Sequence, residues 1–323
     1  MTKREPADLS MDVLLEGLAA ALADYNRNGD PLVHIGGYLR RGAVFSCGDL
    51  IIKCFFHSAD TKFARECRAY DFLAGSGLPV PVLIASGRLD AGTPWILTTR
   101  LPGQLGATLW KNLKTRARID LNHQAGTLLA KLHLLSVDER LTGLPLSDAV
   151  PKYLELLALR LERYAREAAV IDDRATSRAQ ARAWTTDLLR YVPRQLCFTH
   201  GDFSMRNLNL REIDGAWEIS GLFDFEQCEY GDPAADFARM LIATEDWNSE
   251  EFSSFLDAYA GLAPLPARER VLLHLGAMAL DAAGWAYDKD RAYYTFLLDI
   301  VDRIEAEPRT LPSRLPHASS STP

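Results

Sequence analysis

Two short segments of the sequence carry the residues best suited to chemistry. The first spans residues 200–207 and contains Asp202 and Asn207, and the second spans residues 223–226 and contains Asp224. They place two carboxylates and one carboxamide in short loops after strand-like runs. Phosphoryl transfer assisted by magnesium needs an acceptor beside the attacking hydroxyl and oxygen ligands for the metal. The arrangement therefore suits a phosphotransferase, in which Asp202 would be the base and Asn207 and Asp224 would be magnesium ligands.

A predicted hairpin connects the two segments. Residues 207–212 and 217–222 read as strands, and Asp214-Gly215 between them is a turn pair typical of hairpins. The pattern H-x-D-x-x-x-x-N has the spacing of the kinase motif H-R-D-L-x-x-x-N, but it is weak by itself. A hairpin that leads directly to D-F-E, where the kinase motif D-F-G supplies a metal ligand, makes a chance match less plausible. We expect the hairpin to hold Asn207 and Asp224 side by side at its two ends.

These motifs resemble those of the aminoglycoside phosphotransferase family, the antibiotic and small-metabolite kinases that share the protein-kinase fold. The resemblance rests on His200-Gly201-Asp202, Asn207, Asp224 and the segment from Gly231 to Ala238 (GDPAADFA). It extends less specifically to Lys53, Glu66 and the Leu-Pro-Gly at 101–103, so it covers most of the chain. The resemblance implies transfer of the γ-phosphate of ATP or GTP to a hydroxyl group of a small molecule, with Mg²⁺.

The resemblance also implies an α+β, bilobal protein-kinase-like fold. We expect an N-lobe at 1–102, with a small antiparallel sheet and one main helix, to bind the nucleotide. A larger, mostly helical C-lobe at 103–310 would contain the catalytic loop, the metal site and the substrate-binding helices. Residues 311–323, rich in Pro and Ser, are expected to form a flexible tail. The hinge between the lobes would lie near Pro102.

Lys53 and Glu66 are the predicted pair on the nucleotide side. Lys53 lies in the middle of an apolar run at 50–56, where an edge-strand lysine facing water is the alternative. Glu66 shares the buried face of the following helix with Phe63 and Tyr70. A carboxylate directed at a sheet is costly unless paired, so we expect it to bind Lys53 rather than remain solvated. By resemblance, the pair holds Lys53 against the α- and β-phosphates, which also makes Lys53 a candidate catalytic residue.

Four further residues are candidates for nucleotide binding. Gly36 and Gly37 lie at the first turn of the predicted sheet, which could fold over the phosphates. They do not form G-x-G-x-x-G, and turn geometry is the alternative role. By resemblance, the strand at 95–99 and the residues after it meet the adenine, which makes Thr98 and Arg100 the other candidates.

Several residues near the two motifs have supporting or open roles. His200 is expected to order the loop backbone, and Asp236, by resemblance, to brace the catalytic loop. Asp232 precedes a proline at a helix start and is expected to be structural. Arg206 would touch the transferred phosphate or form a surface salt bridge. Glu226 replaces the glycine of D-F-G, and it would serve the metal or the substrate.

The rest of the chain reads largely as amphipathic helices. Their expected ranges are 9–25, 60–74, 119–135, 144–169, 176–191, 249–260, 268–287 and 291–304. His133 lies in the third of these, where a packed or capping histidine is expected rather than a ligand. No long activation segment or A-P-E pattern follows Asp224, which favours a small-molecule kinase over a protein kinase.

The acceptor would lie over Asp202, against the helices that follow Asp236. Candidate residues there are Glu229, Glu245, Asp246, Trp247, Asp281, Trp285 and Asp288. If the acidic ones converge, they would attract an amino sugar or a basic peptide antibiotic. The tryptophans would stack on a sugar or nucleoside, or belong to the core.

Three functional hypotheses follow. The first is an O-phosphotransferase acting on an aminoglycoside, tuberactinomycin or nucleoside antibiotic and conferring resistance. The second is a metabolic kinase acting on choline, homoserine or a sugar. The third is a nucleotide-binding pseudoenzyme, against which the joint presence of Lys53, Glu66, Asp202, Asn207 and Asp224 argues.

Composition indicates which class of protein this is and where it is expected to be located. The 323 residues are 48% hydrophobic and 24% charged, as in a globular protein, and the net charge of −7 argues mildly against nucleic acid as a partner. The five cysteines show no C-x-x-C spacing, which indicates reduced thiols. No apolar run approaches membrane-spanning length, and the N-terminus lacks the apolar core of a signal peptide. We therefore expect a cytoplasmic monomer or homodimer without membrane contact.

Overall fold

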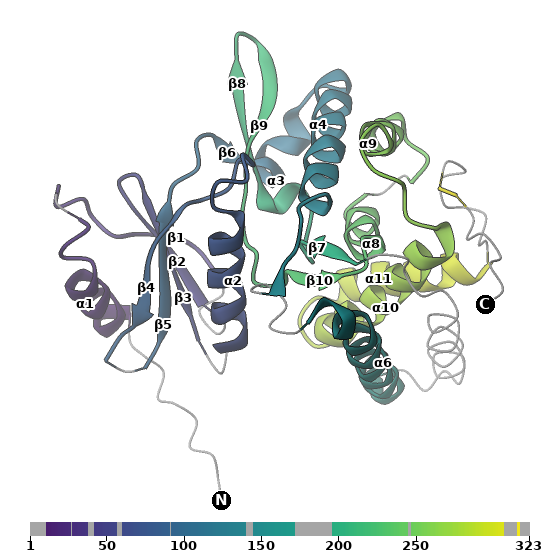
Figure 1. Cartoon of the computed structure of the whole chain (residues 1–323), viewed down its shortest axis with the longest axis horizontal. Coiled ribbons are helices and arrows are strands. Elements are labelled where there is room, and N and C mark those ends of the chain that lie inside the picture. Colours follow the sequence, from purple (N-terminus) through teal and green to yellow (C-terminus); the bar gives the residue numbers. More distant parts are fainter. Residues whose placement is uncertain are drawn as a thin grey trace, which may run out of the picture. The chain divides into compact units, whose positions relative to one another are not determined.

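The chain divides into two compact units in the computed structural model, which describes residues 11–26, 28–37, 42–56, 60–90, 92–139, 145–171, 196–244, 247–306 and 315–316. The first unit combines Met1–Pro102 with Ser220–Gln227, and the second combines Gly103–Ile219 with Cys228–Pro323. Figure 1 shows both units with their elements labelled. Each unit has its own core and is described by itself.

A five-stranded sheet forms the centre of the first unit. Its order is β1-β2-β3-β5-β4, and every neighbouring pair is antiparallel. The strands are β1 (Val33–Gly36), β2 (Gly42–Cys47), β3 (Leu50–Phe55), β4 (Leu83–Arg88) and β5 (Pro94–Thr99). β2 and β3 are joined by a tight turn at Gly48-Asp49, in which Gly48 has a positive φ of 57°.

Two helices cover the two faces of this sheet, α1 (Met11–Ala21) and α2 (Asp60–Leu73) (Figure 1). Side chains of a strand alternate between its faces. Ile52 and Cys54 of β3 therefore join the core formed with Leu14 and Leu18 of α1, while Lys53 between them points to the side of α2. This alternation places a lysine against a helix that carries Glu66.

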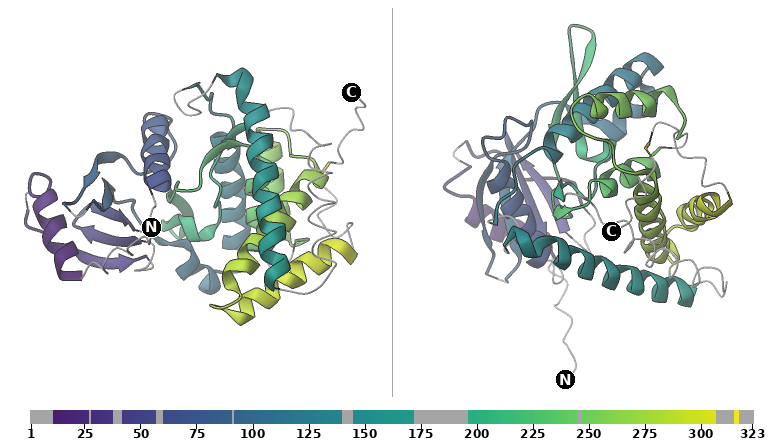
Figure 2. Two further views of the ribbon diagram at one scale, coloured as in Figure 1. Left: turned by 90° about the horizontal axis from the view of Figure 1, so that it is seen from below. Right: turned by 45° about the vertical axis from the view of Figure 1, so that its right-hand side comes forward.

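The second unit is mostly helical. In the described residues, its helices are α3 (Gly106–Leu109), α4 (Thr115–His133), α6 (Leu146–Ile171), α8 (Ala234–Ile242), α9 (Glu250–Ala260), α10 (Arg268–Ala286) and α11 (Arg291–Ala306), with 3-10 turns at Trp110–Asn112 and Met205–Asn207. α4 packs along α9, and α10 packs against α6, α8 and α11 (Figure 2). The helix pair α4 and α9 is close because Gly126 lies where any Cβ would overlap the carbonyl oxygen of Phe255.

Short strands complete the second unit. β7 (Cys197–Thr199) pairs antiparallel with β10 (Glu229–Gly231), and β6 (Gln104–Leu105), β8 (Leu208–Ile213) and β9 (Ala216–Leu222) form a three-stranded sheet. The last three residues of β9, from Ser220, are counted with the first unit. The β8–β9 turn consists of Asp214 and Gly215, with φ of 52° and 78°. Positive φ at both central residues is the geometry that an Asp-Gly turn favours, so the predicted hairpin is confirmed.

The structure confirms the α+β class, with an antiparallel sheet in one unit and a largely helical second unit. The predicted helices at 249–260, 268–287 and 291–304 correspond to α9, α10 and α11. Three of the described strands were not predicted: β4, whose sequence LIASGR is weakly apolar, the two-residue β6 and the three-residue β10. The first predicted helix, 9–25, ends earlier than expected, at Ala21, and Tyr25 beyond it is exposed. Assigning nucleotide binding and catalysis to separate lobes stays a prediction.

Some predictions concern residues that the structure does not describe. The expected helix at 176–191 and most of the tail at 311–323 lie outside the described residues. Within that tail, Leu315 is buried and the Pro316 carbonyl accepts a hydrogen bond from the Arg268 amide at 2.8 Å. Among the helices of the described ranges, none is long and apolar enough to span a bilayer. All five cysteines are free thiols.

Candidate active site

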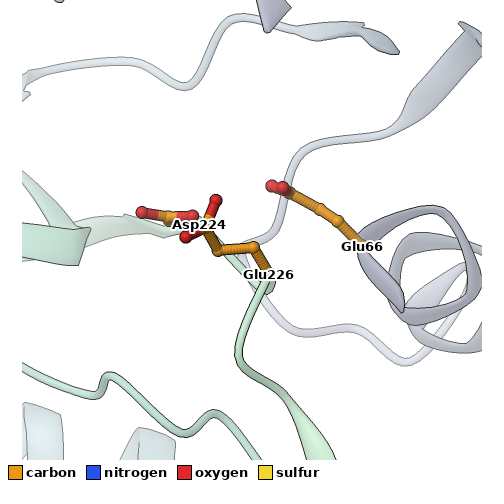
Figure 3. Close-up of side chains that lie close together, drawn as sticks. All are labelled: Glu66, Asp224 and Glu226. Atoms are coloured by element: carbon orange, nitrogen blue, oxygen red, sulfur yellow. The ribbon is translucent and has the colours of Figure 1, made fainter. Parts of the chain in front are cut away.

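In the first unit, the Lys53 ammonium lies among three carboxylates. Its Nζ is 2.8 Å from Glu66 Oε2, 2.7 Å from Asp224 Oδ1 and 3.0 Å from Glu226 Oε2. Glu66 comes from α2, while Asp224 and Glu226 come from the segment after β9, and the three carboxylates point toward one another (Figure 3). The predicted ion pair of Lys53 and Glu66 is thus present. We call these four side chains the lysine–carboxylate cluster.

Local packing fixes the cluster. The Ser220–Gln227 segment is tied to its own unit by a hydrogen bond from the Leu222 amide to the Pro79 carbonyl, at 2.8 Å. Asp224 has φ of 69°, a left-handed conformation uncommon outside glycine. Tyr70 donates its hydroxyl to Glu66 Oε1 at 3.1 Å, and its ring meets Phe225 edge to face. Strained backbone held by surrounding contacts is common at functional sites.

Two basic residues of α2 hold Glu226. The Lys62 ammonium is 2.6 Å from Glu226 Oε1, and Arg65 donates to the Glu226 backbone carbonyl at 3.2 Å. The sequence analysis did not identify Lys62 or Arg65. A basic residue one turn before Glu66 on the same helix was the available signal, but its partner lies 164 positions further along the chain.

Burial and charge act in opposite directions within the cluster. Burial favours the neutral form of Lys53, but the carboxylates of Glu66, Asp224 and Glu226 outweigh it, and its pKa lies well above the ordinary value. Burial raises the pKa of Glu66 to about 7, although Lys53 opposes the change. Glu226 is also partly buried, but Lys53 and Lys62 together lower its pKa to about 2. The ammonium form of Lys53 is therefore secure at neutral pH.

The other candidates for nucleotide binding lie on the sheet of the same unit. Gly36 ends β1, and Gly37 after it has φ of 92°, where a Cβ would overlap the Gly42 carbonyl oxygen. Thr98 is buried in β5, and the Arg100 amide donates to the Asp49 carbonyl at 2.8 Å. Turn geometry accounts for Gly37, while nucleotide roles for all four residues stay predictions.

In the second unit, the buried carboxylate of Asp236 frames the loop that carries Asp202. Its Oδ2 accepts from the His200 amide and its Oδ1 from the Gly201 amide, both at 2.8 Å. Gly201 adopts φ of 77°, which turns its amide toward α8. Burial alone would raise the pKa of Asp236, but His133 and His200 outweigh it and lower that pKa. Asp236 thus remains an acceptor at both oxygens, as expected for a residue that braces this loop.

The backbone of Asp202 is fixed on both sides. Its amide donates to His200 Nδ1 at 3.2 Å, and its carbonyl accepts from Asn207 Nδ2 at 2.8 Å. His200 therefore orders the loop, as predicted. Because the Asn207 amide nitrogen is committed to this bond, its Oδ1 remains a potential metal ligand.

Two arginines meet the Asp202 carboxylate at the same oxygen. Arg239 Nε of α8 donates a hydrogen bond to Oδ1, and Arg206 Nη2 lies 3.4 Å from that atom. The Arg206 side chain is 57% exposed, and it forms the surface salt bridge that was one of its two expected roles, while contact with the transferred phosphate stays a prediction. Arg239 was missed, although an arginine three residues after Asp236 in an otherwise apolar helix was a usable signal.

His133 and Asp232 are structural residues, as predicted. His133 is buried and lies between the Tyr259 hydroxyl, at 2.8 Å, and Asp236 Oδ2, at 3.0 Å. Asp232 Oδ1 accepts from the Ala234 amide at the start of α8, at 3.1 Å, and its other oxygen binds Arg270 and His274. The start of α8 is therefore anchored to α10.

The residues expected to contact the acceptor substrate lie in different environments. Glu229 of β10 pairs with Thr199 next to the catalytic loop, and its carboxylate binds Arg160 of α6 at 2.6 and 3.0 Å. Trp247 is buried, with its Nε1 donating to the Leu241 carbonyl at 3.0 Å, so it belongs to the core and does not stack on a ligand. Asp281, Trp285 and Asp288 lie on or just after α10, and Glu245 and Asp246 are outside the described residues.

Each unit offers oxygen donors of the kind that the predicted magnesium site needs. In the first unit, Glu66, Asp224 and Glu226 have carboxylate oxygens within 4.8 Å of one another. In the second unit, Asn207 offers an amide oxygen, and magnesium binding by Asn207 and Asp224 stays a prediction. Carboxylate and amide oxygens are the ligands that Mg²⁺ prefers. The ammonium group of Lys53 is of the kind that binds a polyphosphate. The carboxylate of Asp202 is of the kind that accepts the proton of a hydroxyl group.

Comparison with known proteins gives the same classification. The model of the phosphotransferase enzyme family matches residues 38–273, well over half of the chain. The chain is 26% identical over 215 residues to viomycin phosphotransferase of Streptomyces vinaceus, covering 66% of this chain and 70% of that protein.

Solved structures with the same fold include two aminoglycoside phosphotransferases. The GDP complex of aminoglycoside 2'-phosphotransferase-IIIa has a TM-score of 0.66 at 16% identity, over 91% of this chain and 99% of that one. The streptomycin–ATP complex of APH(2")-IIa has a TM-score of 0.60 at 17% identity, over 90% and 99%. The predicted fold is thereby confirmed, and the chain belongs to the phosphotransferase enzyme family.

Proposed function

We propose that the protein transfers the γ-phosphoryl group of a nucleoside triphosphate to a hydroxyl group of a small-molecule antibiotic and so confers resistance. The observation that carries the proposal is the fixed Asp202 carboxylate, whose loop is held by Asp236, His200 and Asn207. A base that is positioned before the substrate arrives favours this reaction, because phosphoryl transfer depends on placement more than on covalent help.

In the proposed reaction, Asp202 takes the proton of the acceptor hydroxyl. The hydroxyl oxygen forms a bond to the γ-phosphorus, the bond from that phosphorus to the β–γ bridging oxygen breaks, and the nucleoside diphosphate leaves. Lys53 would bind the α- and β-phosphates, with Glu66 holding its ammonium in place. Asn207 and Asp224 would supply oxygen ligands to Mg²⁺, which when bound neutralises phosphate charge.

The acceptor class is proposed from the relatives and from charge. Viomycin phosphotransferase and the aminoglycoside phosphotransferases are named for antibiotics, which favours an antibiotic over a metabolite. The net charge of −7 is compatible with a cationic drug, although it does not select one. We propose a tuberactinomycin-type peptide or an aminoglycoside as acceptor, and a cytoplasmic location where either drug meets the nucleotide.

The nucleotide is proposed to be ATP or GTP. Complexes of the structural relatives include GDP in one case and ATP in another, so both nucleotides belong in the assay. Thr98, Arg100, Gly36 and Gly37 are the residues proposed to contact it besides Lys53.

The test combines growth with product analysis. A sensitive host expressing the gene is grown against tuberactinomycin, aminoglycoside and nucleoside antibiotics, with an Asp202→Ala strain as the control. We expect protection by the wild type alone, and a gain of about 80 Da, one phosphoryl group, on the protecting drug incubated with purified protein and nucleotide. No protection against any drug, with no phosphorylated product, would contradict the proposal.

A further inference from the structure

Helix α8 buries every one of its residues except Arg239. The neighbours of this arginine in the helix are Ala, Phe, Met, Leu and Ile side chains, apart from Asp236 one turn earlier. An arginine in such a helix is unfavourable unless its guanidinium is paired. Its presence there calls for a partner, and the partner is the side chain of Asp202.

The pair is shielded but still accessible to a small molecule. The Arg239 side chain is 19% exposed and that of Asp202 is 24% exposed. Arg239 donates through Nε, a nitrogen near the rigid base of the guanidinium group, and a charge-assisted bond of this kind fixes direction as well as distance. Arg239 and Arg206 both approach Oδ1 of Asp202. Among the described residues, none donates a hydrogen bond to Oδ2 of Asp202.

One helix therefore controls both the backbone and the side chain of the catalytic loop. Asp236 holds the amides of His200 and Gly201, and Arg239, three residues later on the same helical face, holds the carboxylate of Asp202. The start of this helix is itself anchored through Asp232 to α10. Loop and helix are thus joined through both backbone and side-chain hydrogen bonds within the second unit.

We propose that Arg239 is a positioning residue for phosphoryl transfer: it holds Oδ1 of Asp202 and thereby leaves Oδ2 to take the proton of the acceptor hydroxyl. This inference rests on the proposed function. A purely structural ion pair is the competing explanation, and it predicts lost stability without a selective loss of turnover.

The experiment compares Arg239→Gln, Arg239→Lys and Arg239→Ala with the wild type under saturating nucleotide and acceptor. Positioning predicts that Arg239→Gln lowers kcat by roughly 10²-fold, the usual effect of a misplaced catalytic group, while KM for the nucleotide stays near the wild-type value. Arg239→Lys should restore part of kcat, because it keeps the charge but loses the planar fork. Added guanidinium ion should restore part of the turnover of Arg239→Ala.

A matched control uses an exposed arginine of the β8–β9 hairpin in the same unit, whose carboxylate partner is not Asp202. Arg211 of β8 also donates through Nε to a carboxylate, that of Glu218. Arg211→Gln should retain the wild-type kcat. Rates are expressed per folded molecule, judged from the thermal transition, so that a loss of folded protein is not counted as a loss of turnover.

The outcomes are distinct. Wild-type kcat in Arg239→Gln overturns this inference and leaves the proposed function standing. A fall in kcat that neither lysine nor guanidinium ion relieves also overturns it, because that result describes a structural pair. A wild-type protein that phosphorylates no acceptor overturns both proposals. A selective, rescuable loss of kcat supports the positioning role.

Discussion

The charged side chains of the candidate active site are each held inside their own unit by opposite charges or backbone amides. Lys53 binds three carboxylates, and Asp236 binds two amides and a histidine. Hydrogen bonds with an ionised partner are stronger than neutral ones. When one partner is removed, the buried charge of the other is left unpaired, which is unfavourable. Substitution of one such residue should therefore change the free energy of unfolding, which can be measured without an assay of activity.

Glu226 should make stability depend on acid pH. Its pKa is lowered in the folded protein to about 2, so its contribution is present above its unfolded pKa and is lost as pH falls from about 4.5 to about 2. Glu226→Gln should lower the free energy of unfolding by at most about 3 kcal/mol at pH 7 and by clearly less at pH 3. Urea denaturation of both proteins at the two pH values measures the difference.

A difference between the two proteins that is the same at pH 7 and pH 3 would contradict the ionic role of Glu226. Lys62→Met offers an independent check, because it removes one of the two ammonium groups that bind this carboxylate. It should reduce the pH dependence without abolishing it, since Lys53 remains.

Replacing Asp236 by the isosteric asparagine should destabilise the protein. An asparagine at this position would turn an amino group toward one of two backbone amides that both need an acceptor. We expect Asp236→Asn to lower the free energy of unfolding by about 3 kcal/mol, because it leaves buried donors unpaired. Asp302→Asn, at an exposed position of α11, should change it by less than about 0.5 kcal/mol. Equal effects of the two substitutions would refute the role of Asp236.

At the scale of elements, sequence patterns predicted those features that depend on neighbours in the chain. The Asp214-Gly215 turn, the alternation that turns Lys53 away from Ile52, and the helical face that carries Glu66 all follow local periodicity. β4 and β10 were missed because weak or very short patterns form strands only when a neighbouring strand supplies hydrogen bonds.

The close packing of α4 on α9 gives a prediction at this scale. Gly126→Ala would force a methyl group into the Phe255 carbonyl, and we expect thermal unfolding to begin at a lower temperature, for a loss of about 1 to 3 kcal/mol. Gly17→Ala of α1 is the matched control, since its Cβ would meet only Leu89 side-chain atoms at 3.5 Å or more. That change should be neutral or stabilising, because alanine favours helix. Similar destabilisation by both would argue against the packing explanation.

For the whole molecule, the family could be identified from a few motif residues, whereas the acceptor could not. Lys62 and Arg239 escaped prediction because each acquires its role only when distant segments meet, as Lys62 does with Glu226. Trp247 was a candidate stacking residue, yet its ring is buried under Arg303, with the guanidinium carbon 4.1 Å from its centroid. Helix packing, which a single sequence does not specify, decides which side chains remain open to a drug.

The proposed chemistry depends most on Asp202. The direct test measures phosphate transfer and nucleotide affinity side by side in the wild type and in Asp202→Ala, with the drug identified by the growth assay as acceptor. The proposal predicts a loss of at least about 10²-fold in turnover, the usual contribution of a general base, with nucleotide affinity unchanged. Unchanged turnover in Asp202→Ala would contradict it.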